Sequence, residues 1–553
     1  MKKHIYIKLL AFVAVMGFIS CEDYLDKYPL DKPSDATFYS TESELIMAIN
    51  GIYNTSMYYK KADSPFNLVI DCASDISWDR DQGSDLQLLG EGLHVPTNKT
   101  FEELWNKSYS VISECNMLLA NMHKAKDKTD AGLYERIEGE ARFFRAYHHH
   151  LLLHYFGNIP LITEPQSITG KPGQASKEEV NSFILQELED AAAKLPLSYT
   201  GDNTGRVTRG AALAIKARQA LFMENWNVTS DACKRIIESG EYALEPEFAD
   251  LFSYRNAQSK EKILYIEYSR ANKYYHGVPG NLFSRMASGY SNKVPPQSLV
   301  DSYYCIDGLP IHESPLYDAS KPFENRDPRL DATIVLPGSI FVGYQFETHP
   351  DSLECWDYTV TPAVRRANQD VTNPYATFSG YCWRKYTDEE RTFRLQSEQS
   401  VIIVRYAEVL LMYAEALNEM GQMNETGYSA LNAVRERVGM PAVTETSQEK
   451  LRYLIRNERK VELAMEGLRF FDIRRWKIAE EVMTGNLYGR PKGDYLATYI
   501  PVFDKNGTPH YDAYADNLKS FDSRSFNPAR DYIFPIPQKE MDINSNLKQN
   551  PNY

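Results

Sequence analysis

A long helical stripe between Glu135 and Leu161 constrains the fold more than any other feature of the chain. Mostly apolar residues recur there every three or four positions, at Ile137, Ala141, Phe144, His148, Leu151 and Tyr155. This spacing places all of them on one face of an α-helix. Gly157 and Pro160 then supply the stop signal. The sequence therefore predicts a long, well-packed helix that ends close to Gly157.

Further helical stripes occur in pairs on both sides of the middle of the chain. Residues 205–226 are followed by a second stripe at 231–244, and residues 404–422 by one at 428–441. Alanines recur at corresponding places in the two members of each pair: Ala217 and Ala232, and Ala414 and Ala430. Small residues at such places let antiparallel helices approach closely, as in tetratricopeptide repeats of about 34 residues. We therefore expect a mainly α fold in which tetratricopeptide-like helix pairs form a scaffold.

The chain changes character between residues 245 and 399, where prolines cluster and no long helical stripe occurs. Short apolar runs at 262–269 and 332–338 predict strands. A long stretch with little regular structure is commonly a functional insertion. We therefore divide the chain into a signal peptide (1–20), an N-terminal helical part (21–244), a loop-rich ligand-binding insertion (245–399) and a C-terminal helical part (400–553).

The first 21 residues are similar to the export signal of a bacterial lipoprotein. Three lysines lead into an apolar run over residues 9–19, which is too short to span a membrane. Ser20, a small residue, directly precedes Cys21, as in the box at which such signals are cleaved. We expect acyl chains on Cys21 to anchor the mature protein, because two or more chains hold a protein stably in a membrane. An ordinary secreted protein is the alternative.

Charge and cysteine usage exclude several classes of function. The formal net charge is −14, which argues against nucleic-acid binding because that requires basic patches facing phosphates. No C-x-x-C pair occurs, so neither a zinc ribbon nor a redox motif is supported, and no cofactor is expected. We expect buried free thiols at the six cysteines after Cys21: Cys72, Cys115, Cys233, Cys305, Cys355 and Cys382.

The histidines of the long stripe invite a comparison with metal sites. His150 and His154 are one helical turn apart, but Leu151 occupies the place where the zincin pattern has glutamate. A third ligand is also missing, so we expect these histidines, with His148 and His149, to pack rather than to bind a metal. No G-x-S-x-G, P-loop or G-x-G-x-x-G element occurs, and we expect no enzymatic activity. The 75 acidic residues leave a surface glycoside hydrolase as an alternative.

Two charged motifs indicate structural salt bridges rather than a site. Residues 457–476 alternate in charge around an apolar helical stripe, which is typical of intramolecular ion pairing. Residues 326–329 read Arg-Asp-Pro-Arg, which predicts a turn tied by carboxylate–guanidinium pairs.

Five stretches, in order along the chain, together resemble the SusD/RagB family of outer-membrane lipoproteins: residues 140–161, 325–334, 405–419, 455–476 and 532–553. The resemblance implies a tetratricopeptide-like scaffold that carries a loop-rich ligand-binding region. It also implies a role as the binding lid of a SusC-like TonB-dependent transporter, at the cell surface of the outer membrane. The acidic residues Glu22, Asp23 and Asp26 are similar to the stretch that accompanies surface export in such proteins.

Aromatic residues among polar ones in loops are the best candidates for a ligand site. Trp78 lies in the polar segment 71–85, which lacks a helical stripe to bury it. Sugar rings offer flat C–H faces to aromatic rings and hydroxyls to carboxylates and guanidinium groups. The candidate ligand-binding residues are Asp75, Trp78, Arg80, Tyr274, Tyr275, Tyr290, Trp356 and Trp383.

These observations favour a lipid-anchored surface protein that captures an oligosaccharide and delivers it to a transporter barrel, without covalent chemistry. Within the same family, a peptide-binding lid is the alternative. A scaffold that uses only tetratricopeptide grooves to bind other proteins is a further one.

Overall fold

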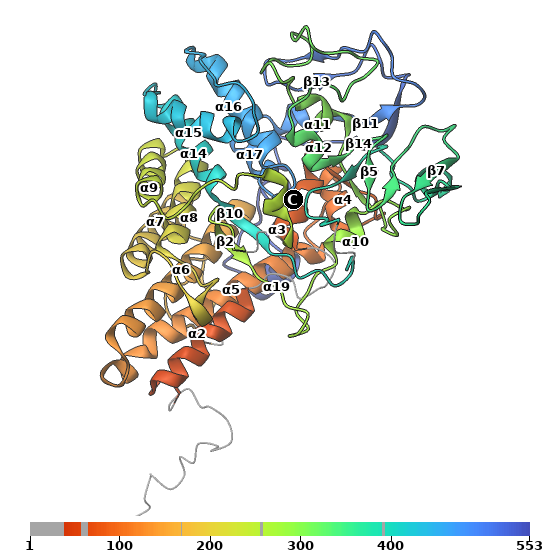
Figure 1. Cartoon of the computed structure of the whole chain (residues 1–553). Helices are drawn as coiled ribbons and strands as arrows, with labels where there is room; N and C mark the ends of the chain where they lie inside the picture. Colours follow the sequence, from red (N-terminus) through yellow and green to blue (C-terminus); the bar gives the residue numbers. More distant parts are fainter. Residues whose placement is uncertain (1–37, 57–64, 168, 255–257, 390–392) are drawn as a thin grey trace, which may run out of the picture.

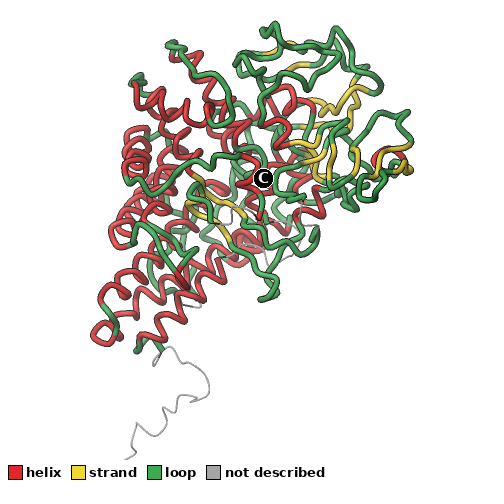
Figure 2. Tube along the Cα trace, in the orientation of Figure 1, coloured by secondary structure: helices red, strands yellow, loops and turns green. Residues whose placement is uncertain are grey.

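The structure is a computed structural model, and it describes residues 38–56, 65–167, 169–254, 258–389 and 393–553. Cys21 and the predicted signal peptide lie outside these residues. Helices stack on one side of the molecule, while loops and short strands occupy the other (Figures 1 and 2). The predicted class, mainly α with short strands in a loop-rich part, is confirmed. None of the helices described is long and apolar enough to cross a bilayer.

The helical scaffold is built from both halves of the chain. Neighbouring helices pack in sequence order from α5 to α9, and α14 then packs against α8, α9, α15 and α16. The long helices of this stack are α2 (Glu42–Ser56), α5 (Lys99–Asn121), α6 (Ala131–Phe156), α7 (Lys177–Lys194), α8 (Arg209–Phe222), α9 (Trp226–Glu238), α14 (Tyr406–Glu419), α15 (Glu425–Glu436) and α16 (Gln448–Glu462). The alanines predicted at close helix contacts, among them Ala217, Ala232 and Ala414, are fully buried. The second half of the chain thus returns to extend the stack begun by the first.

Local sequence explains where these helices begin and end. Asp130 accepts a hydrogen bond from the backbone N–H of Leu133 and so caps α6. Gly157 ends this helix with a φ of 73°, a conformation that glycine adopts readily. Other helices begin with a side chain that accepts from the first turn, at Ser176, Thr208, Asn225, Asn424 and Ser447. The long predicted helix is therefore confirmed, together with its stop signal.

The loop-rich side consists of several small antiparallel sheets rather than one large one. Strands β2 (Lys262–Ile266) and β10 (Val401–Arg405) pair where the insertion leaves and rejoins the scaffold. The four-stranded sheet has the order β5 (Ile340–Phe341), β6 (Tyr344–Gln345), β7 (Glu354–Asp357), β8 (Val364–Ala367). The two-stranded sheets pair β1 (Trp78–Asp79) with β3 (Lys293–Val294), β4 (Ile334–Val335) with β9 (Cys382–Trp383), β11 (Gly485–Pro491) with β14 (Leu518–Arg524), and β12 (Val502–Phe503) with β13 (Pro509–His510). The strands predicted within 262–269 and 332–338 are present as β2 and β4.

The C-terminal part is less helical than predicted. After α18 (Ala479–Val482) the chain forms β11 to β14, which lie beside the insertion in Figure 1. It then returns to the scaffold through α19 (Gln538–Ile543). Residues 485–524 therefore belong in space with the loop-rich side, a contact over long sequence separation that helical periodicity does not reveal.

Buried ion pairs fix the scaffold to the insertion, as the charged motifs predicted. Glu462 is fully buried at the end of α16 and accepts from Arg329 at 2.8 Å, from Arg405 at 2.6 Å and from Arg437. Burial by itself raises the pKa of the Glu462 carboxyl, but these three guanidinium groups together hold it well below its usual value. Arg329 also pairs with Asp327 at 2.6 Å, which confirms the predicted tied turn. All six cysteines after Cys21 are buried, as expected.

Candidate functional site

Trp78, the leading candidate from sequence, is buried rather than displayed. Only 4% of its side chain is exposed, and its ring lies 5.4 Å from that of Phe378 and 5.1 Å from that of Phe521. The expectation that its segment is too polar for a core was wrong. The polar neighbours find distant partners: Asp79 pairs with Lys293 at 3.1 Å, so the segment can be buried without unpaired charge. The Trp78 ring therefore offers no open face to a sugar.

Two further candidate residues, Trp383 and Asp75, are also buried. Trp383 is fully buried in β9, within the main hydrophobic core. Asp75 is buried and accepts two hydrogen bonds of 2.8 Å from the guanidinium group of Arg469. Neither side chain presents the free ring face or the free carboxylate that the sequence analysis expected of it.

Arg80 and Tyr290, by contrast, do come together at the surface. Arg80 donates to the backbone oxygen of Tyr290 at 2.9 Å and also to that of Tyr375. Arg285 donates to the same Tyr375 oxygen at 2.8 Å. The two guanidinium groups lie 5.5 Å and 5.9 Å from the centre of the Tyr375 ring, which is 61% exposed. We call Arg80, Arg285, Tyr290 and Tyr375 the Arg80–Tyr375 cluster.

The Arg80–Tyr375 cluster is electropositive. Burial lowers the pKa of the Arg80 guanidinium, and the like charge of Arg285 lowers it further. Burial also lowers the pKa of Arg285, against the attraction of Asp370. Neither guanidinium has a carboxylate oxygen within 4.0 Å among the residues that the structure describes. Nearby carboxylates, Asp81 and Asp79 for Arg80 and Asp370 for Arg285, therefore attract these guanidinium groups without pairing directly with them.

A basic groove adjoins the segment that carries Tyr375. This groove has a volume of about 480 Å³. Three stretches of chain line it: Asn373, Pro374, Ala376, Thr377 and Phe378 of that segment; Thr348, Pro350, Asp370, Val371 and Gly380 nearby in the insertion; and Arg490, Pro491, Lys492 and Lys519 from β11, the turn after it and β14. Phe378 both forms its wall and packs on Trp78. Segment 71–85, which contains Trp78, thus packs behind one wall of the groove. We call this pocket the basic groove.

The remaining aromatic candidates differ in position. Trp356 is 38% exposed on β7, stacks near Tyr358 at 6.4 Å, and has the Arg365 guanidinium 5.3 Å from its ring centre. Its hairpin continues through β8 and α13 (Gln369–Thr372) toward Tyr375. Trp356 is therefore a partly exposed ring on the same loop-rich side, already in contact with Arg365 and Tyr358.

Tyr274 and Tyr275 lie on a different loop. Tyr274 is half-buried and stacks on Tyr268 with ring centres 5.0 Å apart, and burial raises the pKa of its hydroxyl to about 12. Tyr275 is also half-buried. Within the described chain, no hydrogen bond or ring contact connects these two tyrosines to the Arg80–Tyr375 cluster.

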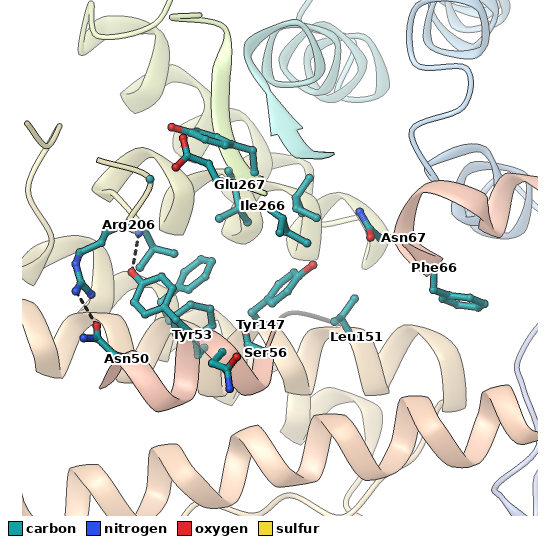
Figure 3. Close-up of a pocket in the computed structure, with 18 of the residues that line it drawn as sticks. Asn50, Tyr53, Ser56, Phe66, Asn67, Tyr147, Leu151, Arg206, Ile266 and Glu267 are labelled. Atoms are coloured by element: carbon teal, nitrogen blue, oxygen red, sulfur yellow. Dashed lines mark hydrogen bonds between the residues drawn. The ribbon is translucent and has the colours of Figure 1, made fainter. Parts of the chain in front are cut away.

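A second cavity, shown in Figure 3, lies between the scaffold and β2 and has a volume of about 410 Å³. Aromatic and aliphatic side chains such as Tyr53 and Tyr147 form most of its wall. At one end, Arg206 donates to Asn50 at 2.7 Å, and the Tyr53 hydroxyl accepts from the Val207 N–H at 2.9 Å. These polar groups already bind one another, so this cavity suits sugar hydroxyls less well than the basic groove does.

The histidines of α6 are packed, as expected. His150 and His154 both contact the side-chain oxygen of Gln219, at 2.7 Å and 2.8 Å. Burial lowers the pKa of His148 and of His150 to about 3 and that of His149 to about 4, so the imidazoles are neutral. The described residues contain no group of three or more side chains arranged to hold a metal ion.

Sequence reasoning missed most of this site. Arg285, Tyr375 and the groove cations Arg490, Lys492 and Lys519 come from three widely separated segments. Tyr375 carried a usable signal, because it directly follows Asn373-Pro374 in the proline-rich insertion, where turns expose side chains. The basic residues carried none, because single lysines and arginines are common on any surface.

Comparisons with known proteins agree with this architecture. The family model described as "SusD family" matches residues 260–553, and one described as "Starch-binding associating with outer membrane" matches residues 23–221. A SusD-like protein, P2, from Formosa agariphila is 26% identical over the full length of both chains. A SusD-like carbohydrate-binding protein from Bacteroides fragilis is 30% identical, with a TM-score of 0.81 over 93% of this chain and 100% of that one. A laminarin-binding SusD-like protein shares the fold at 22% identity, with a TM-score of 0.65 over 93% of this chain and 100% of that one. Because the first model covers more than half of the chain and solved relatives share its whole fold, the chain belongs to the SusD family.

Proposed function

We propose that this protein binds oligosaccharides at the Arg80–Tyr375 cluster and the adjoining basic groove. The observation that carries the proposal is an exposed tyrosine ring, flanked by two arginines without carboxylate partners, beside a groove of about 480 Å³. Such a ring can stack on a sugar face while guanidinium groups donate to its oxygens. The relative from Bacteroides fragilis, itself named as carbohydrate-binding, supports this ligand class.

The basic groove fits binding better than cleavage. Glycoside hydrolysis generally uses two carboxyl groups, about 5 to 9 Å apart. Asp370 is the one carboxylate among the described residues that line the groove, and it is buried. Its carboxylate accepts from the backbone N–H of Arg285 at 2.6 Å, which indicates a structural role.

Anchoring and delivery complete the proposal. The description of the second matching family model, "associating with outer membrane", supports association of this chain with that membrane. We propose that acyl chains on Cys21 hold the protein there at the cell surface, and that it passes its ligand to a SusC-like TonB-dependent transporter. A lid of this kind is expected to bury more than roughly 2,000 Å² against its barrel if the complex is permanent.

The test of binding uses the chain without residues 1–21 and a panel of polysaccharides and peptides, measured by affinity electrophoresis and calorimetry. We expect Tyr375→Ala to weaken oligosaccharide binding about 30-fold, the usual loss for a central aromatic contact of about 2 kcal/mol. Its melting temperature should be unchanged because the ring is exposed. Tyr453→Ala on α16, a partly exposed tyrosine of the scaffold, is the matched control. Retention of peptides but of no polysaccharide would refute the proposal in favour of a peptide-binding lid.

A further inference from the structure

Positive charge is distributed in two different ways in this molecule. In the scaffold, buried arginines meet carboxylates closely: Arg329, Arg405 and Arg475 each have one within 2.8 Å. On the loop-rich side, Arg80, Arg285, Lys492 and Lys519 have none within 4.0 Å among the described residues. The chain contains 75 acidic and 61 basic residues, so unpaired cations gathered at one place are a departure from its overall composition.

Arg490 supplies the buried cation of the basic groove. Its side chain is 3% exposed, and its Nε has no hydrogen-bond partner in the described structure. Its Nη1 lies 3.4 Å from Glu347, whose same oxygen also accepts from two backbone N–H groups at 2.7 Å and 2.9 Å. Glu347 therefore compensates the charge of Arg490 only in part. Its other hydrogen bonds go to neutral oxygens, those of Thr348 at 3.3 Å and Gly493 at 2.9 Å, so an anion in the groove would meet a charge that is only partly compensated.

The two lysines of the basic groove add charge at its exposed rim. Lys492 donates to the backbone oxygen of Asp516 at 2.8 Å, a neutral acceptor, and Lys519 lies 5.7 Å from the centre of the Phe378 ring. The other charged group of the lining is Asp370, which is buried and held by the backbone N–H groups of Arg285 and Met286. The basic groove and the Arg80–Tyr375 cluster share segment 373–378, and we treat the two together as one patch, in which cations outnumber carboxylates.

We propose that this patch selects acidic oligosaccharides, whose carboxylate or sulfate groups bind Arg490, Lys492 and Lys519 while a sugar ring stacks on Tyr375. This inference rests on the proposed glycan-binding function and narrows its ligand class. Carboxylates and sulfates share the oxygen acceptors that guanidinium and ammonium groups bind. A net charge of −14 disfavours general attraction of polyanions to the protein, so their binding requires a local site of this kind.

The experiment compares two acidic sets with a neutral set by affinity electrophoresis. Polygalacturonate and alginate carry carboxylates, chondroitin sulfate and dextran sulfate carry sulfates, and laminarin, dextran, galactan and mannan are neutral. The variant Lys492→Gln/Lys519→Gln removes the rim charge. The control Lys126→Gln/Lys171→Gln removes the same charge from exposed lysines elsewhere on the surface.

We expect retention of at least one acidic polysaccharide, weakened about tenfold in the groove variant and unchanged in the control variant. Raising the salt concentration should weaken this retention as well, because exposed charges are screened. The carboxylated and sulfated arms show which acidic group is preferred. Retention of neutral polymers only, or equal retention by the groove variant, would overturn the inference while leaving the proposed function intact. Retention of no polysaccharide at all would overturn both.

Discussion

The buried position of Trp78 leads to a prediction that separates a structural role from a ligand-stacking role. The ring fills a small cluster with Val294 and Leu487 and packs on Phe378 and Phe521. A buried tryptophan removes about 150 to 250 Å² from water, worth about 4 to 6 kcal/mol at about 25 cal/mol per Å². Measured truncations of large core aromatics cost about 3 to 5 kcal/mol, because the cavity that remains relaxes in part.

We therefore expect Trp78→Ala to lower the free energy of unfolding by about 3 to 5 kcal/mol and to lower the melting temperature by several degrees. Urea denaturation followed by circular dichroism measures the first quantity and calorimetry the second. Trp78→Phe keeps an aromatic ring in the cluster and should recover most of the loss. Trp356→Ala, at an exposed ring, should change stability by less than about 0.5 kcal/mol.

Ligand binding by the same variants completes the test. Because Phe378 both packs on Trp78 and lines the basic groove, Trp78→Ala should also weaken oligosaccharide binding, but only together with its loss of stability. An unchanged melt with a large loss of affinity would refute this argument. It would mean that the Trp78 ring contacts the ligand directly.

Three further predictions concern the ion pairs, the histidines and the anchor. Glu462→Gln should cost about 3 to 5 kcal/mol in urea denaturation because it leaves buried guanidinium groups undercompensated, whereas exposed Glu436→Gln should cost almost nothing. The pKa of His150 is lowered to about 3 in the fold, against 6.5 for the free side chain, so the unfolded chain binds the extra proton between these values. The stability that His150 contributes is therefore complete above pH 6.5 and is lost as the pH falls below this value. His150→Gln should reduce the loss of stability between pH 7.5 and pH 5.0 by about 2 kcal/mol, and an equal loss in both proteins would contradict burial of the neutral ring. Cys21→Ala should release the protein from the outer membrane in fractionation of cells that lack the transporter, and continued membrane association there would contradict lipid anchoring.

The scaffold could be predicted because its signals are local. The stripe of α6, its cap at Asp130 and its stop at Gly157 all lie within one continuous segment. The charged motif on α16 was also recognisable, since alternating charges around an apolar stripe indicate ion pairs even before their partners are known. Its actual partners, such as Arg329 and Arg405, required the structure.

The site could be predicted only in part because its residues meet over long sequence distances. The polarity of the Trp78 segment was judged without Lys293, which pairs with Asp79, or Arg469, which pairs with Asp75. With those partners in place, a polar segment can be buried. The sequence predicts Arg80 and Tyr290 because each lies in a loop with other candidates. Tyr375, the tyrosine between Arg80 and Arg285, follows them by 295 and 90 residues respectively.

The separation of paired and unpaired cations connects the fold to the proposed ligand class. Ion pairs in the scaffold have a structural role, because they hold helices of the two chain halves against the insertion. The opposite charges of these pairs cancel. Cations that stabilised the fold in the same way would pair directly with carboxylates. Among the described residues, those of the Arg80–Tyr375 cluster and the basic groove have one carboxylate within 4.0 Å, Glu347 beside Arg490. At physiological salt, charges beyond about 8 Å are largely screened, so the acidic remainder of the surface does not neutralise this patch. The same screening means that the patch acts on a ligand already in the groove rather than drawing it from a distance. Selection among glycans therefore depends on close contact between their acidic groups and these side chains.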